Sequence, residues 1–130
     1  MKRNSGFSLV ELMIVIVIIG VLAAVAVPIY SNNVMKAKMS EADAALGSIR
    51  TMLRVYYGEN GEYINSANTA VAGLSGVDIK EAELAGKYFN AASYTYEGSA
   101  DTFLITCAKG DILDADRTLS HVGDLLGGTL

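Results

Sequence analysis

The chain has few of the residues on which catalytic and disulfide-stabilised proteins depend. Its 130 residues include one cysteine, one histidine, one proline and no tryptophan. The single cysteine, Cys107, excludes an intramolecular disulfide, so the stability of the chain must come from other interactions. The sequence around the only histidine, His121, matches no motif, and no nucleophile elbow, phosphate loop or zinc spacing occurs. We therefore expect neither an enzyme nor a cofactor.

Basic residues are also scarce. Ten lysines and arginines against fourteen acidic residues give a formal net charge of −4. Removing Lys2 and Arg3, which precede the apolar run, leaves eight basic against fourteen acidic residues. An acidic chain with no basic cluster in its sequence argues against nucleic acid as the main partner.

One acidic stretch raises the question of metal binding. Asp111, Asp114 and Asp116 in "GDILDADRT" offer carboxylates of the kind that calcium prefers. The segment lacks the glycine and the terminal glutamate of an EF-hand loop. A solvated acidic turn is therefore the favoured interpretation, and we predict no metal site.

A long apolar run is the dominant feature that the sequence does contain. Residues 12–27 carry no charge, whereas residues 30–130 resemble one ordinary soluble domain. Residues 7–29 would form a helix of about 34 Å, enough to cross a bilayer core of about 30 Å. Three interpretations follow: a cleaved secretory signal, a membrane anchor, or a retained helix that packs against other proteins.

Glu11 distinguishes these interpretations. A charge inside a membrane helix costs about 2.5–3.5 kcal/mol at the bilayer centre and usually marks function. A disposable signal gains nothing from such a carboxylate, and a simple anchor is weakened by it. The residue therefore favours a helix that meets other proteins.

The stretch "GFSLVELMIVIVIIGVLAAVAVPIY" closely resembles the amino terminus of type IV pilins and of type II secretion pseudopilins. In that family a short basic leader ends in glycine, phenylalanine follows, and glutamate is the fifth residue of the processed chain. Gly6, Phe7 and Glu11 match this order and spacing. The resemblance implies a leader at residues 1–6, cleavage between Gly6 and Phe7 by prepilin peptidase, and N-methylation of Phe7.

The new amino terminus gives Glu11 a partner. An α-amino group is positively charged below about pH 8, so Glu11 of one subunit would neutralise Phe7 of a neighbouring subunit. Two unit charges 4 Å apart attract by about 4 kcal/mol at an effective dielectric constant of 20. This attraction offsets much of the desolvation cost without necessarily exceeding it, so Glu11 is expected to select subunit register.

Gly20 and Pro28 interrupt the helical pattern of residues 7–29. Pro28 cannot donate a hydrogen bond to the carbonyl of Ala24, so a kink is expected near Pro28. The family resemblance suggests that the Gly20–Pro28 stretch extends when subunits pack into a filament. A kink without any role in assembly is the alternative.

Beyond Pro28 the pattern becomes amphipathic. Apolar residues recur with helical spacing at Ala42, Ala45, Leu46, Ile49, Met52, Leu53 and Tyr56. We therefore predict one helix from about Phe7 to Tyr57, with residues 30–57 as its amphipathic continuation. Gly58 would be its left-handed cap, and Asn60-Gly61 the turn that follows.

Residues 58–130 are predicted to form a globular head. One short helix is expected at residues 78–84, and β-strands at "ASYTYEG", "TFLITCAK" and "RTLSHVG". The first two strands form a hairpin, and Cys107 shares a buried face with Phe103 and Ile105. The predicted fold class is α+β and pilin-like, with one long helix packed on an antiparallel sheet of three to four strands.

The resemblance implies a structural subunit of a type IV pilus, with a type II secretion pseudopilin as the alternative. The implied partners are identical subunits, prepilin peptidase, an inner-membrane platform protein and an assembly ATPase. The precursor would reside in the inner membrane and the product in a surface filament, or in a periplasmic pseudopilus. A remoter alternative is a membrane-anchored module whose head binds a ligand.

Overall fold

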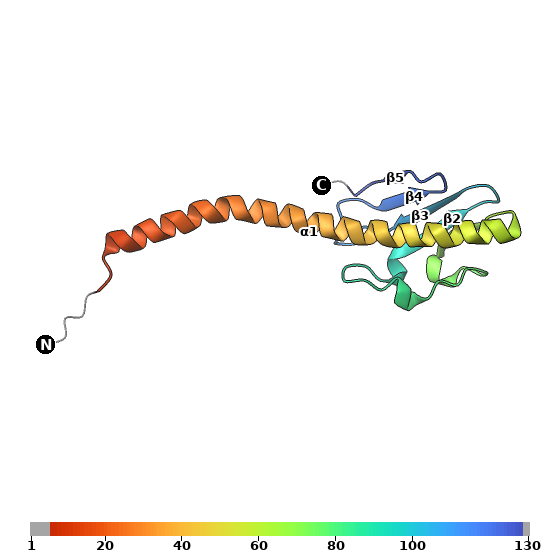
Figure 1. Ribbon diagram of the computed structural model, residues 1–130, viewed down its shortest axis with the longest axis horizontal. Coiled ribbons are helices and arrows are strands. Elements are labelled where there is room, and N and C mark those ends of the chain that lie inside the picture. Colours follow the sequence, from red (N-terminus) through yellow and green to blue (C-terminus); the bar gives the residue numbers. More distant parts are fainter. Residues whose placement is uncertain (1–5, 129–130) are drawn as a thin grey trace. The chain divides into compact units, whose positions relative to one another are not determined.

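The computed structural model describes residues 6–128, so the predicted leader lies outside the described residues except for Gly6. One long helix, α1 (Leu9–Asn60), precedes five β-strands and three short 3₁₀ segments (Figure 1). The chain divides into two compact units, with the boundary between Val34 and Met35. The prediction of one long helix followed by a small sheet is confirmed.

The first unit is a helix without a core of its own. Every described residue up to Asn33 is exposed, including large apolar side chains around the whole circumference of the helix. Its most apolar stretch has a mean hydropathy of 3.1 and is long enough to cross a membrane. A helix that is apolar all round is stable only against lipid or other apolar helices.

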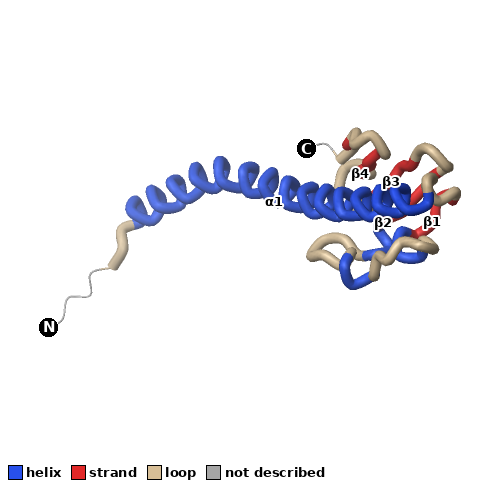
Figure 2. Tube along the Cα trace, turned by 45° about the vertical axis from the view of Figure 1, so that its right-hand side comes forward, coloured by secondary structure: helices blue, strands red, loops and turns tan. Residues whose placement is uncertain are grey.

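The second unit contains an antiparallel sheet in the order β1-β2-β3-β4-β5. The strands lie alongside the C-terminal part of α1 (Figure 2). Their bounds are Ser66–Ala70, Tyr94–Gly98, Phe103–Cys107, Arg117–Ser120 and Leu125–Leu126. The predicted hairpin is confirmed, because β2 and β3 pair in continuous register from Tyr94–Cys107 to Gly98–Phe103.

The predicted strand count of three to four is wrong, because the sheet has five strands. β1, of sequence SANTA, consists of small and polar residues and has an irregular register between Ser66 and Thr69, so it lacks an alternating apolar pattern. β5 contains only two residues, both exposed. Neither strand gives the periodic signal from which a strand is recognised.

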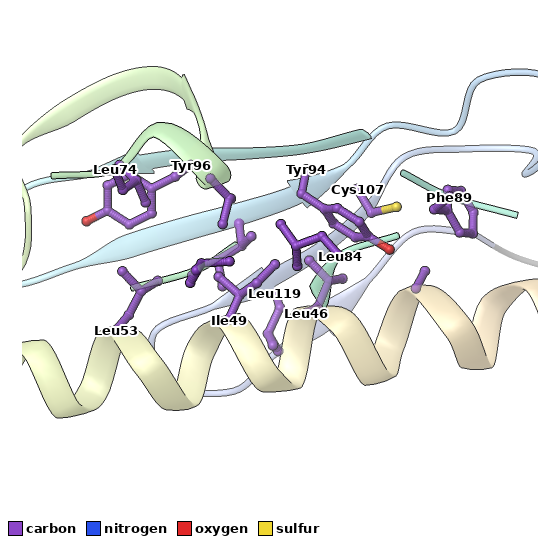
Figure 3. Packing of buried hydrophobic residues seen from close by; sticks show 14 of the residues in the cluster. Leu46, Ile49, Leu53, Leu74, Leu84, Phe89, Tyr94, Tyr96, Cys107 and Leu119 are labelled. Atoms are coloured by element: carbon purple, nitrogen blue, oxygen red, sulfur yellow. The ribbon is translucent and has the colours of Figure 1, made fainter. Parts of the chain in front are cut away.

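The core lies between α1 and the sheet (Figure 3). From the helix come Ala42, Leu46, Ile49 and Leu53, each at most 1% exposed. Facing them are Tyr94, Tyr96, Phe103, Ile105, Cys107 and Leu119. The predicted apolar stripe of the helix and the buried position of Cys107 are therefore confirmed.

Two local predictions need correction. The helix continues through Gly58 to Asn60, and the left-handed cap is Gly61, with φ of 79° and its N–H bonded to the Tyr57 carbonyl. The segment predicted as a helix at residues 78–84 forms only a 3₁₀ turn, Glu81–Glu83. Its buried residues, Ile79 and Leu84, are five apart, which does not place them on one face of an α-helix.

Candidate functional site

The amino-terminal site is built by the first turn of α1. Ser8 precedes the helix, and its backbone N–H donates to Glu11 Oε2 at 2.9 Å. In return the backbone N–H of Glu11 donates to Ser8 Oγ at 3.3 Å. These reciprocal bonds form a capping box, which satisfies two backbone donors that the start of a helix leaves without partners. Glu11 thus stabilises the helix to which it belongs.

The Ser-x-x-Glu pattern at residues 8–11 is typical of a capping box, and it was not recognised in the sequence. The capping hydrogen bond uses only one oxygen of the Glu11 carboxylate. Among the described residues, no side-chain or backbone donor bonds to Glu11 Oε1. Phe7 is 89% exposed at the same end of the helix, so both groups are accessible to another chain.

Gly20 and Pro28 both lie inside α1, and the helix continues through each of them. A Cβ atom at Gly20 would have no neighbour within 4 Å. Pro28 has no N–H, so it leaves the Ala24 carbonyl without its usual helical donor. The place where the helix is weakest is therefore within the exposed apolar segment.

In the second unit, Glu41 joins the helix to the loop that precedes β2. Its carboxylate accepts the backbone N–H groups of Lys87, Tyr88 and Phe89 at 3.1, 2.9 and 2.9 Å. Burial raises the pKa of Glu41. The three N–H donors and the Lys87 charge lower this pKa by a larger amount, so it lies below its ordinary value. A Cβ atom at Gly86 would clash with Glu41 Oε1, so a side chain there would displace the carboxylate from the loop.

Arginines make two further contacts between α1 and the sheet. Arg117 of β4 binds Asp43 with both Nε and Nη2, at 2.7 and 3.0 Å, and also donates to the Gly127 carbonyl. Arg50 donates to the backbone carbonyl of His121 at 3.1 and 3.3 Å. Asp43 and Arg50 lie outside the apolar stripe of α1, and the sequence pattern could not reveal that they bind segments more than 70 residues away.

The remaining candidate residues have structural surroundings. Burial raises the pKa of the Cys107 thiol to about 11, which makes it a poor nucleophile. His121 is half-buried, and its ring lies 6.3 Å from that of Phe103. Asp116 accepts the backbone N–H of Lys109 and so closes the acidic turn. Within residues 6–128, no group of three or more potential ligands is arranged to hold a metal ion.

The fold and the amino-terminal segment together define a class of protein: a chain with an apolar, exposed helix that continues into a small α+β head. Residues 1–27 match the family model of the prokaryotic N-terminal methylation motif. The chain is 39% identical over 96 residues to the fimbrial protein EcpC of Eikenella corrodens, covering 74% of this chain and 58% of that protein. It is 43% identical over 85 residues to a fimbrial protein of Neisseria meningitidis serogroup A, covering 65% and 46%.

A third relative is the type IV major pilin protein PilA of Myxococcus xanthus, which is 42% identical over 66 residues, or 51% of this chain and 30% of that protein. The chain therefore carries the N-terminal methylation motif and is similar to fimbrial proteins and a type IV major pilin over half of its length or more. The chain spans between about a third and three fifths of the length of these relatives.

Proposed function

We propose that this protein is a structural subunit of a type IV pilus and that it polymerises through residues 7–29. One observation supports this function above the others. Residues 7–29 form a segment that is apolar all round and exposed, and it carries a single carboxylate, Glu11, four residues after Phe7. A membrane anchor alone would use that carboxylate only to cap its own helix, at the cost of a charge in the apolar segment.

Processing creates the partner for Glu11. Prepilin peptidase cleaves between Gly6 and Phe7 and methylates the new amino group of Phe7, which keeps its positive charge near neutral pH. The capping box uses Glu11 Oε2, so Oε1 is available to the Phe7 amine of a neighbouring subunit. Glu11 then caps its own helix and also binds the helix of the neighbouring subunit.

The stretch from Gly20 to Pro28 is the segment in which we expect the helix to extend as subunits pack. The missing N–H of Pro28 already removes one hydrogen bond there, and glycine lowers the cost of leaving the helical conformation. Neighbouring helices in a filament would bind the freed backbone groups.

The proposed processing and assembly imply the partners of the chain. The precursor resides in the inner membrane, where prepilin peptidase and the platform protein act on it, and an assembly ATPase supplies the work of extraction. Identical subunits then form the surface filament. The function is assembly, and we infer no reaction catalysed by the chain itself.

A type II secretion pseudopilin would share the same segment and the same processing. The relatives named above are fimbrial proteins or a type IV major pilin, and this favours the pilus. A membrane-anchored ligand-binding module is the remoter alternative, and in it Glu11 would do no more than cap its own helix.

The test is the substitution Glu11→Ala in cells that produce filaments from the unaltered chain. We expect normal cleavage after Gly6, because the scissile bond is retained, but no filaments. Ser8→Ala is the matched control, since it removes the side-chain half of the capping box and keeps the carboxylate, and it should retain filaments. Normal filaments from Glu11→Ala would contradict the proposal.

A further inference from the structure

Folding brings together lysines that are far apart in the sequence. Lys38 of α1 and Lys87 of the loop before β2 place their Nζ atoms 5.9 and 5.2 Å from the centre of the Tyr88 ring. Lys36 is exposed about half a turn before Lys38 and so extends this cluster around the helix. We call Lys36, Lys38, Lys87 and Tyr88 the basic patch. The separation of 49 residues between Lys38 and Lys87 hides this cluster from inspection of the sequence.

One carboxylate, Glu41, lies beside the basic patch and offsets one of its three lysine charges, because it accepts the backbone N–H groups of Lys87 and Tyr88. Of the next two acidic residues of α1, Glu41 binds three backbone N–H groups and Asp43 binds Arg117. Residues 35–130 as a whole carry thirteen acidic and eight basic residues. Three of those eight positive charges therefore lie around one turn of α1 and the loop beside it, with Glu41 offsetting one of them, on an otherwise acidic unit.

The basic patch begins directly after the segment that can span a membrane. Lys36 follows Ile29 by seven residues, which is about 10 Å of helix and at most about 25 Å of extended chain. Whatever the orientation of the two units, Lys36 therefore stays within reach of the membrane surface. Because residues 30–35 tether the basic patch to the membrane segment, the effective concentration of the patch at the membrane surface is high. Even a weak attraction to the lipid headgroups then keeps the patch bound.

We propose that the basic patch binds anionic phospholipid headgroups of the membrane in which the chain is anchored, an inference that rests on the proposed anchoring. Lysine ammonium groups pair with lipid phosphates, and each lysine near an anionic surface contributes about a fivefold factor in affinity. Tyrosine is a preferred residue at the membrane–water interface, where Tyr88 would lie between the lysines. The head would thus rest on the membrane until the subunit enters a filament.

The absence of tryptophan permits a direct measurement. In the full chain, Tyr88→Trp introduces one fluorophore into the basic patch, and Ala37→Trp, at an exposed helix position, provides a second reporter. Each is reconstituted into nanodiscs of phosphatidylcholine, with or without about a third of phosphatidylglycerol, together with headgroup spin-labelled lipid. We expect at least twofold stronger quenching in the anionic discs at low salt, falling to the neutral-disc level at high salt.

Matched variants test which charges are responsible. Lys36→Gln together with Lys87→Gln should reduce quenching in anionic discs to the level of neutral discs. Lys80→Gln together with Arg54→Gln removes the same charge from exposed positions outside the basic patch and should change nothing. Equal quenching in both lipids, or equal loss from both pairs, overturns the inference while leaving the filament proposal intact.

Two other outcomes also decide the question. Quenching that depends on the number of chains per disc, with no dependence on lipid charge, would assign the basic patch to a second copy of the chain and overturn lipid binding. Failure of the chain to insert into any disc would contradict the anchored precursor itself.

Discussion

The contact between Glu41 and the loop before β2 gives a sharp prediction about the stability of the head. Glu41→Ala removes the acceptor for three backbone N–H groups, two of which belong to partly buried hydrogen bonds. Hydrogen bonds to charged groups contribute about 1.5–3 kcal/mol each, and the partial exposure of Glu41 reduces their sum. We expect the free energy of unfolding to fall by about 2–4 kcal/mol.

Glu41→Gln should cost less, about 1–2 kcal/mol, because the amide keeps one acceptor oxygen and directs an NH₂ group toward the loop. Urea titration of the full chain in detergent micelles, followed by the near-ultraviolet circular dichroism of the tyrosines, measures both losses. Glu97→Gln is the matched control, because this exposed carboxylate of β2 makes no hydrogen bond among the described residues. Its stability should equal that of the unaltered chain.

The contribution of Glu41 also depends on pH in a defined direction. Its folded-state pKa lies below the ordinary value of 4.5, so its contribution is fully present above about pH 4.5. It is lost as the pH falls through the folded-state pKa. The unaltered chain should therefore lose more stability than Glu41→Gln on acidification from pH 6 to pH 3. Equal losses, or wild-type stability of Glu41→Ala at pH 7, would refute the role assigned to this carboxylate.

Three further predictions concern the core and its neighbours. Ile49→Ala should lower the free energy of unfolding by about 2–5 kcal/mol in the same urea titration, because Ile49 is 1% exposed between helix and sheet; a loss below 1 kcal/mol would contradict that packing. Asp43→Asn should lower the free energy of unfolding by about 1–3 kcal/mol, because it weakens the bidentate contact with Arg117. An unchanged thermal midpoint would show that this ion pair does not contribute to stability. The Cys107 thiol should react with iodoacetamide at pH 8 only under unfolding conditions, and fast labelling of the folded chain would contradict its burial.

The sequence predicted the elements that have strong periodicity. The helix follows from a continuous apolar run and then from a one-sided stripe, and β2 and β3 follow from β-branched and aromatic residues on either side of a turn. β1 and β5 were missed because small residues, a register irregularity and a length of two residues leave no alternating pattern. The helix end shifted from Gly58 to Gly61 because two glycines compete as caps, and backbone geometry alone selects the second.

The candidate site was predictable only in its local part. Gly6, Phe7 and Glu11 lie within six residues of each other, so their spacing is visible in the sequence. The capping contact of Glu11 with Ser8 was visible too and was overlooked. By contrast, the Glu41 contact and the Lys38–Tyr88 contact of the basic patch join residues 46–50 positions apart, and only the fold reveals that they meet.

The most direct test of the central claim is electron microscopy of material sheared from the cell surface, combined with mass spectrometry of its subunit. The account predicts long filaments whose subunit begins at N-methylated Phe7. Short periplasmic assemblies with the same processed subunit would identify a pseudopilin. A subunit that retains residues 1–6, or a chain that forms no filament, would contradict the account.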